Sequence, residues 1–193
     1  MRNGALAVPA VLDVEASGFG RGSYPIEVGY VLEDGQSRCM LIRPEPEWTH
    51  WDPAAERLHR ITREQLLRNG LPIGEVAEEL NFHLCGRTLY TDGWAHDYSW
   101  LAVLYDAVCR VPTFRLENLR ALLAEDEVDD WRATREEIAD SLGQPRHRAC
   151  ADAWLLQATF RRLRERRPCV AAAPPGTVRP VRRTDSRAPC RPG

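Results

Sequence analysis

The sequence predicts a single α/β domain in which a mixed layer of strands is covered by helices. Three apolar segments separated by short turns open the chain, and they predict a meander of strands. Segments with helical spacing then alternate with short β-rich segments, as in layered α/β domains. The 193 residues suit one core, and 44% hydrophobic against 28% charged residues is typical of a globular protein.

The first strands are predicted from apolar runs that end at turn residues. Residues 8–20 are expected to form a buried strand that runs into a glycine-containing turn. Residues 23–36 predict a second strand ending at an Asp-Gly turn, and residues 37–44 a third at hairpin distance. A proline-interrupted loop follows, and Pro53 stands at the first position of the first predicted helix.

Helix signals dominate the remainder of the chain. Thr62 with Gln65 three residues later predicts a helix start, and Gly86 is a suitable C-terminal cap. The predicted elements, in order, are helices at 53–59, from Thr62 and at 72–86, a strand at 88–92, a helix at 96–110, a strand at 113–118, and helices at 119–125, 129–143 and 149–166.

Composition argues against several functional classes. The longest early apolar stretch is broken by Pro9 and stopped by Asp13, so no segment approaches the roughly 20 apolar residues of a membrane span. We therefore expect a soluble protein with no signal peptide and no membrane partner. A formal net charge of −2 argues against coating nucleic acid through a broadly basic surface. Any contact with nucleic acid is expected to be local.

Two further features concern the organisation of the chain and its compartment. Residues 1–167 are expected to form the folded domain, and residues 168–193, rich in Pro, Ala and Arg, a disordered tail. The tail is interpreted either as a solvated extension or as a basic arm that contacts phosphates or a partner protein. The six cysteines lack a C-x-x-C pair and zinc-ligand spacing, which favours free thiols and a cytoplasmic location over disulfides in an exported protein.

Asp13 and Glu15 stand one residue apart in the first predicted strand, so their side chains face the same side of it. Neighbouring carboxylates repel each other, and a hard metal ion relieves that repulsion. Taken alone the pair favours a solvated strand end. It indicates a metal site only together with other carboxylates.

A third carboxylate, Asp152, lies on the apolar stripe of the last predicted helix, together with Leu156 and Phe160. A buried carboxylate needs a metal ion or a hydrogen-bonded arginine, and Arg148 is the arginine that could meet this need. His147 precedes the helix, where an imidazole suits the role of a general base. A surface histidine without a catalytic role is the alternative.

Two aspartates, Asp92 and Asp97, surround the start of the helix predicted at 96–110. Either could cap that helix, and Asp92 is the one predicted to do so. Asp97 is a candidate functional residue only in combination with the other carboxylates.

In their order along the chain, these residues resemble the DEDDh family of 3′→5′ exonucleases. DVEASGFG is similar to the family's first motif, YTDGWAHDYSWL to its second and HRACADAWLL to its third, over about residues 8–165. The family includes proofreading subunits of bacterial DNA polymerases and several RNA-trimming enzymes. The resemblance implies a ribonuclease-H-like mixed β-sheet flanked by helices on both faces.

The resemblance also implies a metal centre and a reaction. Two Mg²⁺ or Mn²⁺ ions would be held by four carboxylates, those of Asp13, Glu15, Asp97 and Asp152, while His147 activates a water molecule. The reaction would be hydrolysis at the 3′ end of a nucleic acid, single-stranded DNA above all, with release of nucleoside 5′-monophosphates.

Substrate contacts are implied directly after the first motif. Family members use backbone amides there, at the positions of Ala16 and Ser17, and an apolar wedge against terminal bases, at Phe19. Packing into the core is the alternative for Phe19. Gly93 departs from the asparagine that many members have, and His59 begins a segment His-Arg-Ile-Thr where H-G-I-T is common; we expect His59 to brace a loop.

Two alternatives remain open at this point. An exoribonuclease that trims RNA ends or short oligoribonucleotides would share these motifs, because the choice of sugar depends on contacts to the 2′-hydroxyl. A module of another class would keep the fold and bind nucleic acid or a polymerase without turnover. A homodimer, and a polymerase or another partner bound through the tail, are also open.

Overall fold

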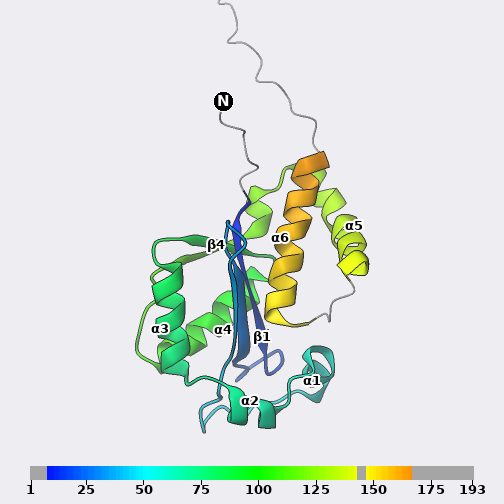
Figure 1. The fold of residues 1–193 in the computed structure, drawn as a ribbon. Helices are drawn as coiled ribbons and strands as arrows, with labels where there is room; N and C mark the ends of the chain where they lie inside the picture. Colours follow the sequence, from blue (N-terminus) through cyan, green and yellow to red (C-terminus); the bar gives the residue numbers. More distant parts are fainter. Residues whose placement is uncertain (1–7, 143–146, 167–193) are drawn as a thin grey trace, which may run out of the picture.

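A central sheet with helices on its two faces forms the molecule, as the computed structural model shows for residues 8–142 and 147–166 (Figure 1). The sequence predicted a folded domain and a separate tail. The tail, residues 168–193, lies outside the described residues, so both of its interpretations stay predictions.

The sheet has five strands in the order β3-β2-β1-β4-β5. The strands are β1 (Ala10–Ala16), β2 (Pro25–Val31), β3 (Ser37–Leu41), β4 (Thr88–Thr91) and β5 (Arg115–Asn118). β1, β2 and β3 pair antiparallel along the chain, whereas β4 is parallel to both β1 and β5. The predicted meander of three strands is confirmed, and the structure adds β4 and β5 through crossover connections. β1 therefore lies in the middle of the sheet and pairs on both sides.

Helices cover both faces of this sheet. They are α1 (Pro53–His59), α2 (Arg63–Asn69), α3 (Ile73–Leu84), α4 (Trp94–Ala107), α5 (Glu125–Leu142) and α6 (Ala149–Arg166). Figure 1 shows α3 and α4 on one face and α6 with α5 on the other. Leu12 and Val14 of β1 pack in the cluster under α3 and α4, while Val11 packs under α6. Within the described ranges no helix has the length and apolarity to cross a bilayer.

The region between β5 and α5 differs from its prediction. A helix was expected at residues 119–125 and another from residue 129. The structure has a single 3₁₀ turn at Leu119–Leu122, and α5 begins at Glu125. Asn118 caps the turn by accepting a hydrogen bond from the amide of Arg120 at 2.9 Å. Glu127 accepts one from the amide of Ala124 at 2.8 Å, and this side-chain bond starts α5 early.

Candidate active site

The two carboxylates of β1 lie on the face that α6 covers. Side chains alternate along a strand, so Asp13 and Glu15 share the side of Val11, which packs with Ala153 and Leu156 of α6. This confirms that the pair faces one side. Both carboxylates are half-buried, unlike side chains at a solvated strand end.

A glycine lets α6 approach the sheet at this position. Gly29 of β2 pairs with Asp13, and a Cβ at residue 29 would lie 2.4 Å from the backbone nitrogen of Cys150. Any side chain there would displace the first turn of α6. Asp152, in that turn, is 9% exposed and shares its buried stripe with Leu156, as predicted.

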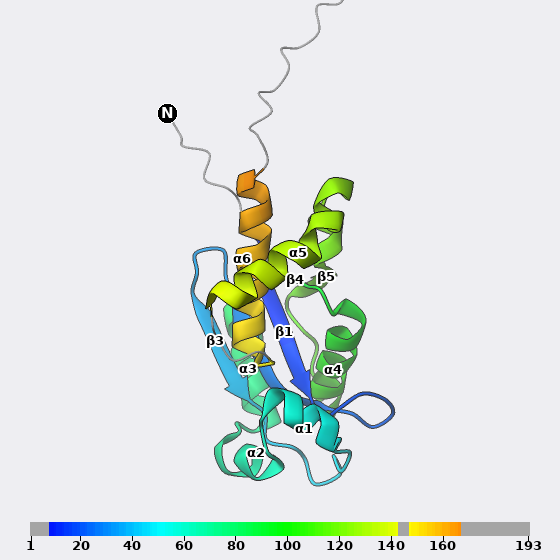
Figure 2. The ribbon, with the colours of Figure 1, turned by 90° about the vertical axis from the view of Figure 1, so that its right-hand side faces the viewer.

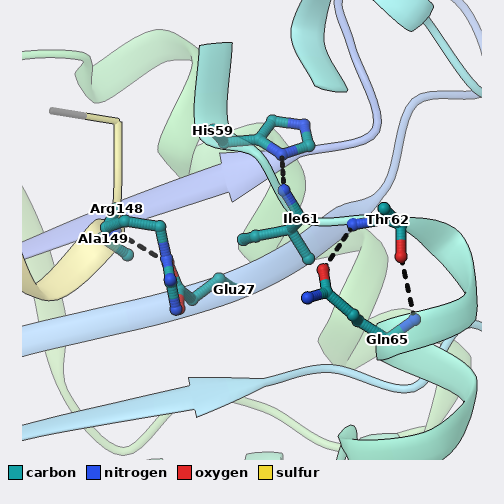
Figure 3. Close-up of polar contacts among 7 residues, drawn as sticks. All are labelled: Glu27, His59, Ile61, Thr62, Gln65, Arg148 and Ala149. Carbon is teal, nitrogen blue, oxygen red and sulfur yellow. Dashed lines mark hydrogen bonds and ion pairs between the residues drawn. The ribbon is translucent and has the colours of Figure 1, made fainter. Parts of the chain in front are cut away.

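Glu27 fixes the start of α6. Its carboxylate is 1% exposed and accepts hydrogen bonds from Arg148 Nε, at 3.0 Å to Oε2, and from the amide of Ala149 at 2.9 Å (Figure 3). A carboxylate at a helix N-terminus is also stabilised by the helix dipole. The interpretation of Arg148 as the partner of Asp152 is therefore wrong, because its guanidinium binds Glu27. Sequence analysis missed Glu27; its pairing opposite Glu15 is the signal that places it on this face.

His147 is tied to the site through its backbone. Its amide donates a hydrogen bond to Oδ2 of Asp152 at 3.0 Å, and its φ of 64° lies in the left-handed region. Few residues other than glycine adopt this conformation, so neighbouring contacts must maintain it. The side chain of His147 is exposed, which leaves the imidazole accessible to a substrate.

Asp97 reaches the site from the opposite face of the sheet. It lies in the first turn of α4, is 3% exposed, and accepts a hydrogen bond from the hydroxyl of Thr91. A Cβ at Gly93 would lie 3.2 Å from Oδ2 of Asp97. The departure at Gly93 therefore leaves space beside the carboxylate and does not disturb it.

Asp92 does not cap α4, contrary to the prediction. The N-cap residue is Gly93, with no side-chain cap, and α4 begins at Trp94, two residues before the helix predicted at 96–110. Asp92 instead lies 3.5 Å from Nη1 of Arg135, on α5. Burial raises the pKa of Asp152, and the positive charge of Arg135 lowers it in part.

These side chains form one electrostatic unit. Ligand atoms of Glu15, His147 and Asp152 all lie within 4.8 Å of one another, the one such trio among the described residues. Burial raises the pKa of Asp13 well above its ordinary value, and the charges of Asp97 and Glu15 raise it further. The structure thus brings the predicted carboxylates together, with Asp13 and Asp97 beside the trio.

The remaining carboxylates of the site also hold their protons more tightly than usual. Burial, followed by the charges of Asp152 and Glu27, raises the pKa of Glu15 to about 7. Burial raises the pKa of Asp97 to about 7 against the hydrogen bond from Thr91, and it also raises the pKa of Asp152. Carboxylates that repel one another in a partly buried site are relieved by a cation. An oxygen-rich donor set with one imidazole fits a hard divalent ion.

The predicted substrate residues have different surroundings. Phe19 is 65% exposed, so packing into the core is excluded; its ring lies 5.0 Å from that of His96 and 5.7 Å from that of Trp100. Ala16 and Ser17 are buried, and the amide of Ser17 donates to the carbonyl of Tyr24 at 2.9 Å. A substrate contact through that amide would compete with this bond.

His59 has the bracing geometry expected of it. The ring is 2% exposed, and its Nδ1 accepts a hydrogen bond from the amide of Ile61 at 3.1 Å (Figure 3). Arg60 between them has a φ of 57°, a left-handed conformation at the end of α1. Glycine adopts this conformation most easily, which explains its frequency at this position in H-G-I-T.

Comparison with known proteins defines the fold. No family model matches the chain, and no curated protein matches it. Among solved structures, it is similar to exonuclease I from Methylocaldum szegediense (TM-score 0.62, 16% identity, 83% of this chain and 41% of that one). It is also similar to E. coli exonuclease I in complex with a dA16 oligonucleotide (TM-score 0.66, 13% identity, 84% and 42%). It is similar, too, to the zinc-bound form of the E. coli ExoI–ssDNA complex (TM-score 0.66, 13% identity, 86% of this chain and 42% of that one).

The fold class is thereby confirmed. The five-stranded mixed sheet with helices on both faces matches the ribonuclease-H-like fold of these exonucleases. The chain spans about two fifths of the length of each of the three structures.

Proposed function

We propose that the protein is a metal-dependent 3′→5′ exonuclease that releases nucleoside 5′-monophosphates from single-stranded nucleic acid. The observation that carries the proposal is the convergence of four carboxylates, from β1, α4 and α6, with His147 just before α6. Burial, followed by the charges of the other three carboxylates, raises the pKa of Asp13. The similarity in fold to exonuclease I, whose structures include complexes with oligonucleotides, supports it.

The proposed ligands of two Mg²⁺ or Mn²⁺ ions are the four carboxylates, Asp13, Glu15, Asp97 and Asp152. Bound divalent ions supply Lewis-acid stabilisation of the charge that develops on the attacking and leaving oxygens. The solved zinc-bound form of a related fold supports the use of a divalent ion. Its identity and number are part of the proposal.

The chain's own groups do the remaining work. An imidazole nitrogen of His147 accepts the proton of the attacking water, and the bond between its amide and Asp152 holds the backbone of the base in place. Phe19, exposed beside His96, stacks against a base near the 3′ end. The terminal phosphodiester bond breaks at its 3′ oxygen, so the phosphate leaves with the terminal nucleoside.

The test is degradation of 5′-labelled single-stranded DNA and RNA of equal sequence, with Mg²⁺, Mn²⁺ or EDTA. Wild type is compared with Asp13→Ala and with the control Asp34→Ala, which changes an exposed turn carboxylate. The proposal predicts a metal-dependent ladder that shortens from the 3′ end, is lost in Asp13→Ala and persists in the control.

The same gel separates the alternatives. A ladder on RNA alone would establish the exoribonuclease. No ladder under any condition would reject the nuclease and favour a module that binds nucleic acid without turnover.

A further inference from the structure

A groove runs from the candidate active site along α5. One hollow of about 350 Å³ is lined by His147 and Asp152, and an adjoining hollow of about 320 Å³ is lined by residues at the end of β5. Arg132 and Arg135 line both hollows, so the two lie side by side along α5. Figure 2 shows α5 running across α6 toward β5. We call the two hollows together the α5 groove.

Helix geometry separates the charges of α5. The helix carries eight acidic residues and two arginines, yet both arginines lie on the groove. Arg132, Arg135 and Ala139 are three and four residues apart, which places them on one face. Acidic side chains on other faces bind α6: Glu127 lies 3.3 Å from Arg164, and Glu137 2.6 Å from Arg166.

A third arginine extends the basic lining away from the carboxylates. Arg120, exposed on the 3₁₀ turn, lines the hollow farther from His147 together with Asn118 and Trp131. Two acids also lie in the α5 groove. Glu136 pairs with Arg132 at 3.1 Å and Asp92 with Arg135 at 3.5 Å. Asp152 is a third acid of the lining, so arginines and acids are equal in number, and the arginines exceed the acids by one once this proposed metal ligand is set aside.

Arg135 has unused hydrogen-bonding capacity. Its Nε is buried and has no hydrogen-bond partner within the described part of the chain, and its Nη1 has only the long contact to Asp92. A guanidinium presents parallel donors that match the oxygens of a phosphate, which makes arginine the preferred residue for phosphate recognition. The side chain of Arg135 is 37% exposed, so a phosphate of the substrate at this position would bind the exposed end of its guanidinium.

We propose that the α5 groove binds the phosphodiester backbone of the nucleic-acid strand on the 5′ side of the scissile bond, through Arg120, Arg132 and Arg135. This inference rests on the proposed function. The terminal nucleotide brings only the scissile phosphate to the carboxylates. A groove with arginines along its length, beginning at His147 and leading away from it, fits the phosphates that follow in the strand.

The test is the affinity of a fluorescently labelled twelve-nucleotide oligothymidylate in EDTA, measured by anisotropy between 50 and 300 mM salt. EDTA prevents turnover, so the readout does not depend on catalysis. We expect the double variant Arg132→Gln/Arg135→Gln to bind about tenfold more weakly near 0.1 M salt, because two charged contacts are lost. The slope of log affinity against log salt should fall by about 1.4, at roughly 0.7 for each lost single-strand phosphate contact.

Two further variants keep the result interpretable. Arg87→Gln removes an arginine that is ion-paired to Glu33 at 2.8 Å, at the opposite end of the sheet, and should keep the affinity and slope of wild type. Arg132→Gln alone changes a side chain that is 90% exposed, so the variant is expected to fold. It should lower the slope of log affinity against log salt by about half as much as the double variant does.

The outcomes separate this inference from the proposed function. Equal affinity and slope in wild type and the double variant would overturn the α5 groove as a binding site, whether or not the protein degrades DNA. Weaker binding with a reduced slope supports it, and would do so even if no ladder formed in the nuclease assay. A drop of the same size in Arg87→Gln would show a nonspecific charge effect and would also overturn it.

Discussion

Replacing Glu27 with glutamine removes the charge that holds the start of α6. In the native protein this buried carboxylate accepts bonds from Arg148 and from the amide of Ala149. Hydrogen bonds to charged groups contribute about 1.5–3 kcal/mol each, but Arg148 is 42% exposed and regains water when released. Loss of the Glu27 charge also relieves some repulsion on Glu15. We therefore expect a loss of about 2 kcal/mol, near the lower value for one such bond.

Urea unfolding followed by circular dichroism measures this loss. The matched control is Glu33→Gln, which breaks an exposed ion pair with Arg87 at 2.8 Å and should cost less than about 1 kcal/mol. The cleavage rate should also fall in Glu27→Gln, measured without denaturant at a temperature where the variant is folded. The reason is that His147 directly precedes Arg148 and Ala149, which Glu27 binds. Equal, small losses of stability in the two variants would refute the reasoning about the buried clamp.

The remaining predictions concern backbone strain, pH and oxidation. Arg60→Gly should raise the free energy of unfolding by about 1 kcal/mol by relieving a left-handed φ, and an equal gain in Arg60→Ala would contradict this. Without divalent ions, burial in the folded protein raises the pKa values of Glu15 and Asp97 to about 7, from ordinary values of 4.5 and 3.8. Its unfolding free energy should therefore fall as pH rises from about 4 to 7, and Mn²⁺ should restore it at pH 7; a curve that Mn²⁺ leaves unchanged would count against the metal site. The thiols of Cys39 and Cys150 are free and lie close enough to shift each other's pKa, so diamide should join them in a disulfide that peptide mass mapping detects. Absence of that cross-link would exclude a close pair.

The central features of the site could be predicted from local sequence. Strand alternation places Asp13 and Glu15 on one side, and helical spacing puts Asp152 on an apolar stripe. Both patterns depend only on the geometry of one element. The structure agrees on all three residues because no distant contact is needed to determine which face they share.

Features that depend on pairing between elements could not be predicted in this way. Glu27 acts through its register opposite Glu15 and through the approach of α6, neither of which is encoded locally. The misassigned cap at Asp92 has a similar cause, because its ion pair with Arg135 forms between the residue after β4 and α5. The α5 groove likewise exists only once three elements are placed around it.

The most direct test of the account is the rate at which terminal nucleotides leave a 5′-labelled oligonucleotide as Mn²⁺ is raised from zero, in wild type and in Asp152→Asn. The substitution keeps the shape of a side chain in the first turn of α6 and removes its charge. The account predicts no release in EDTA, a saturable rise with Mn²⁺ in wild type, and at least a hundredfold lower rate in the folded variant, an estimate on the order of the loss of one key electrostatic group. Release that persists in EDTA, or an equal rate in Asp152→Asn, would contradict it.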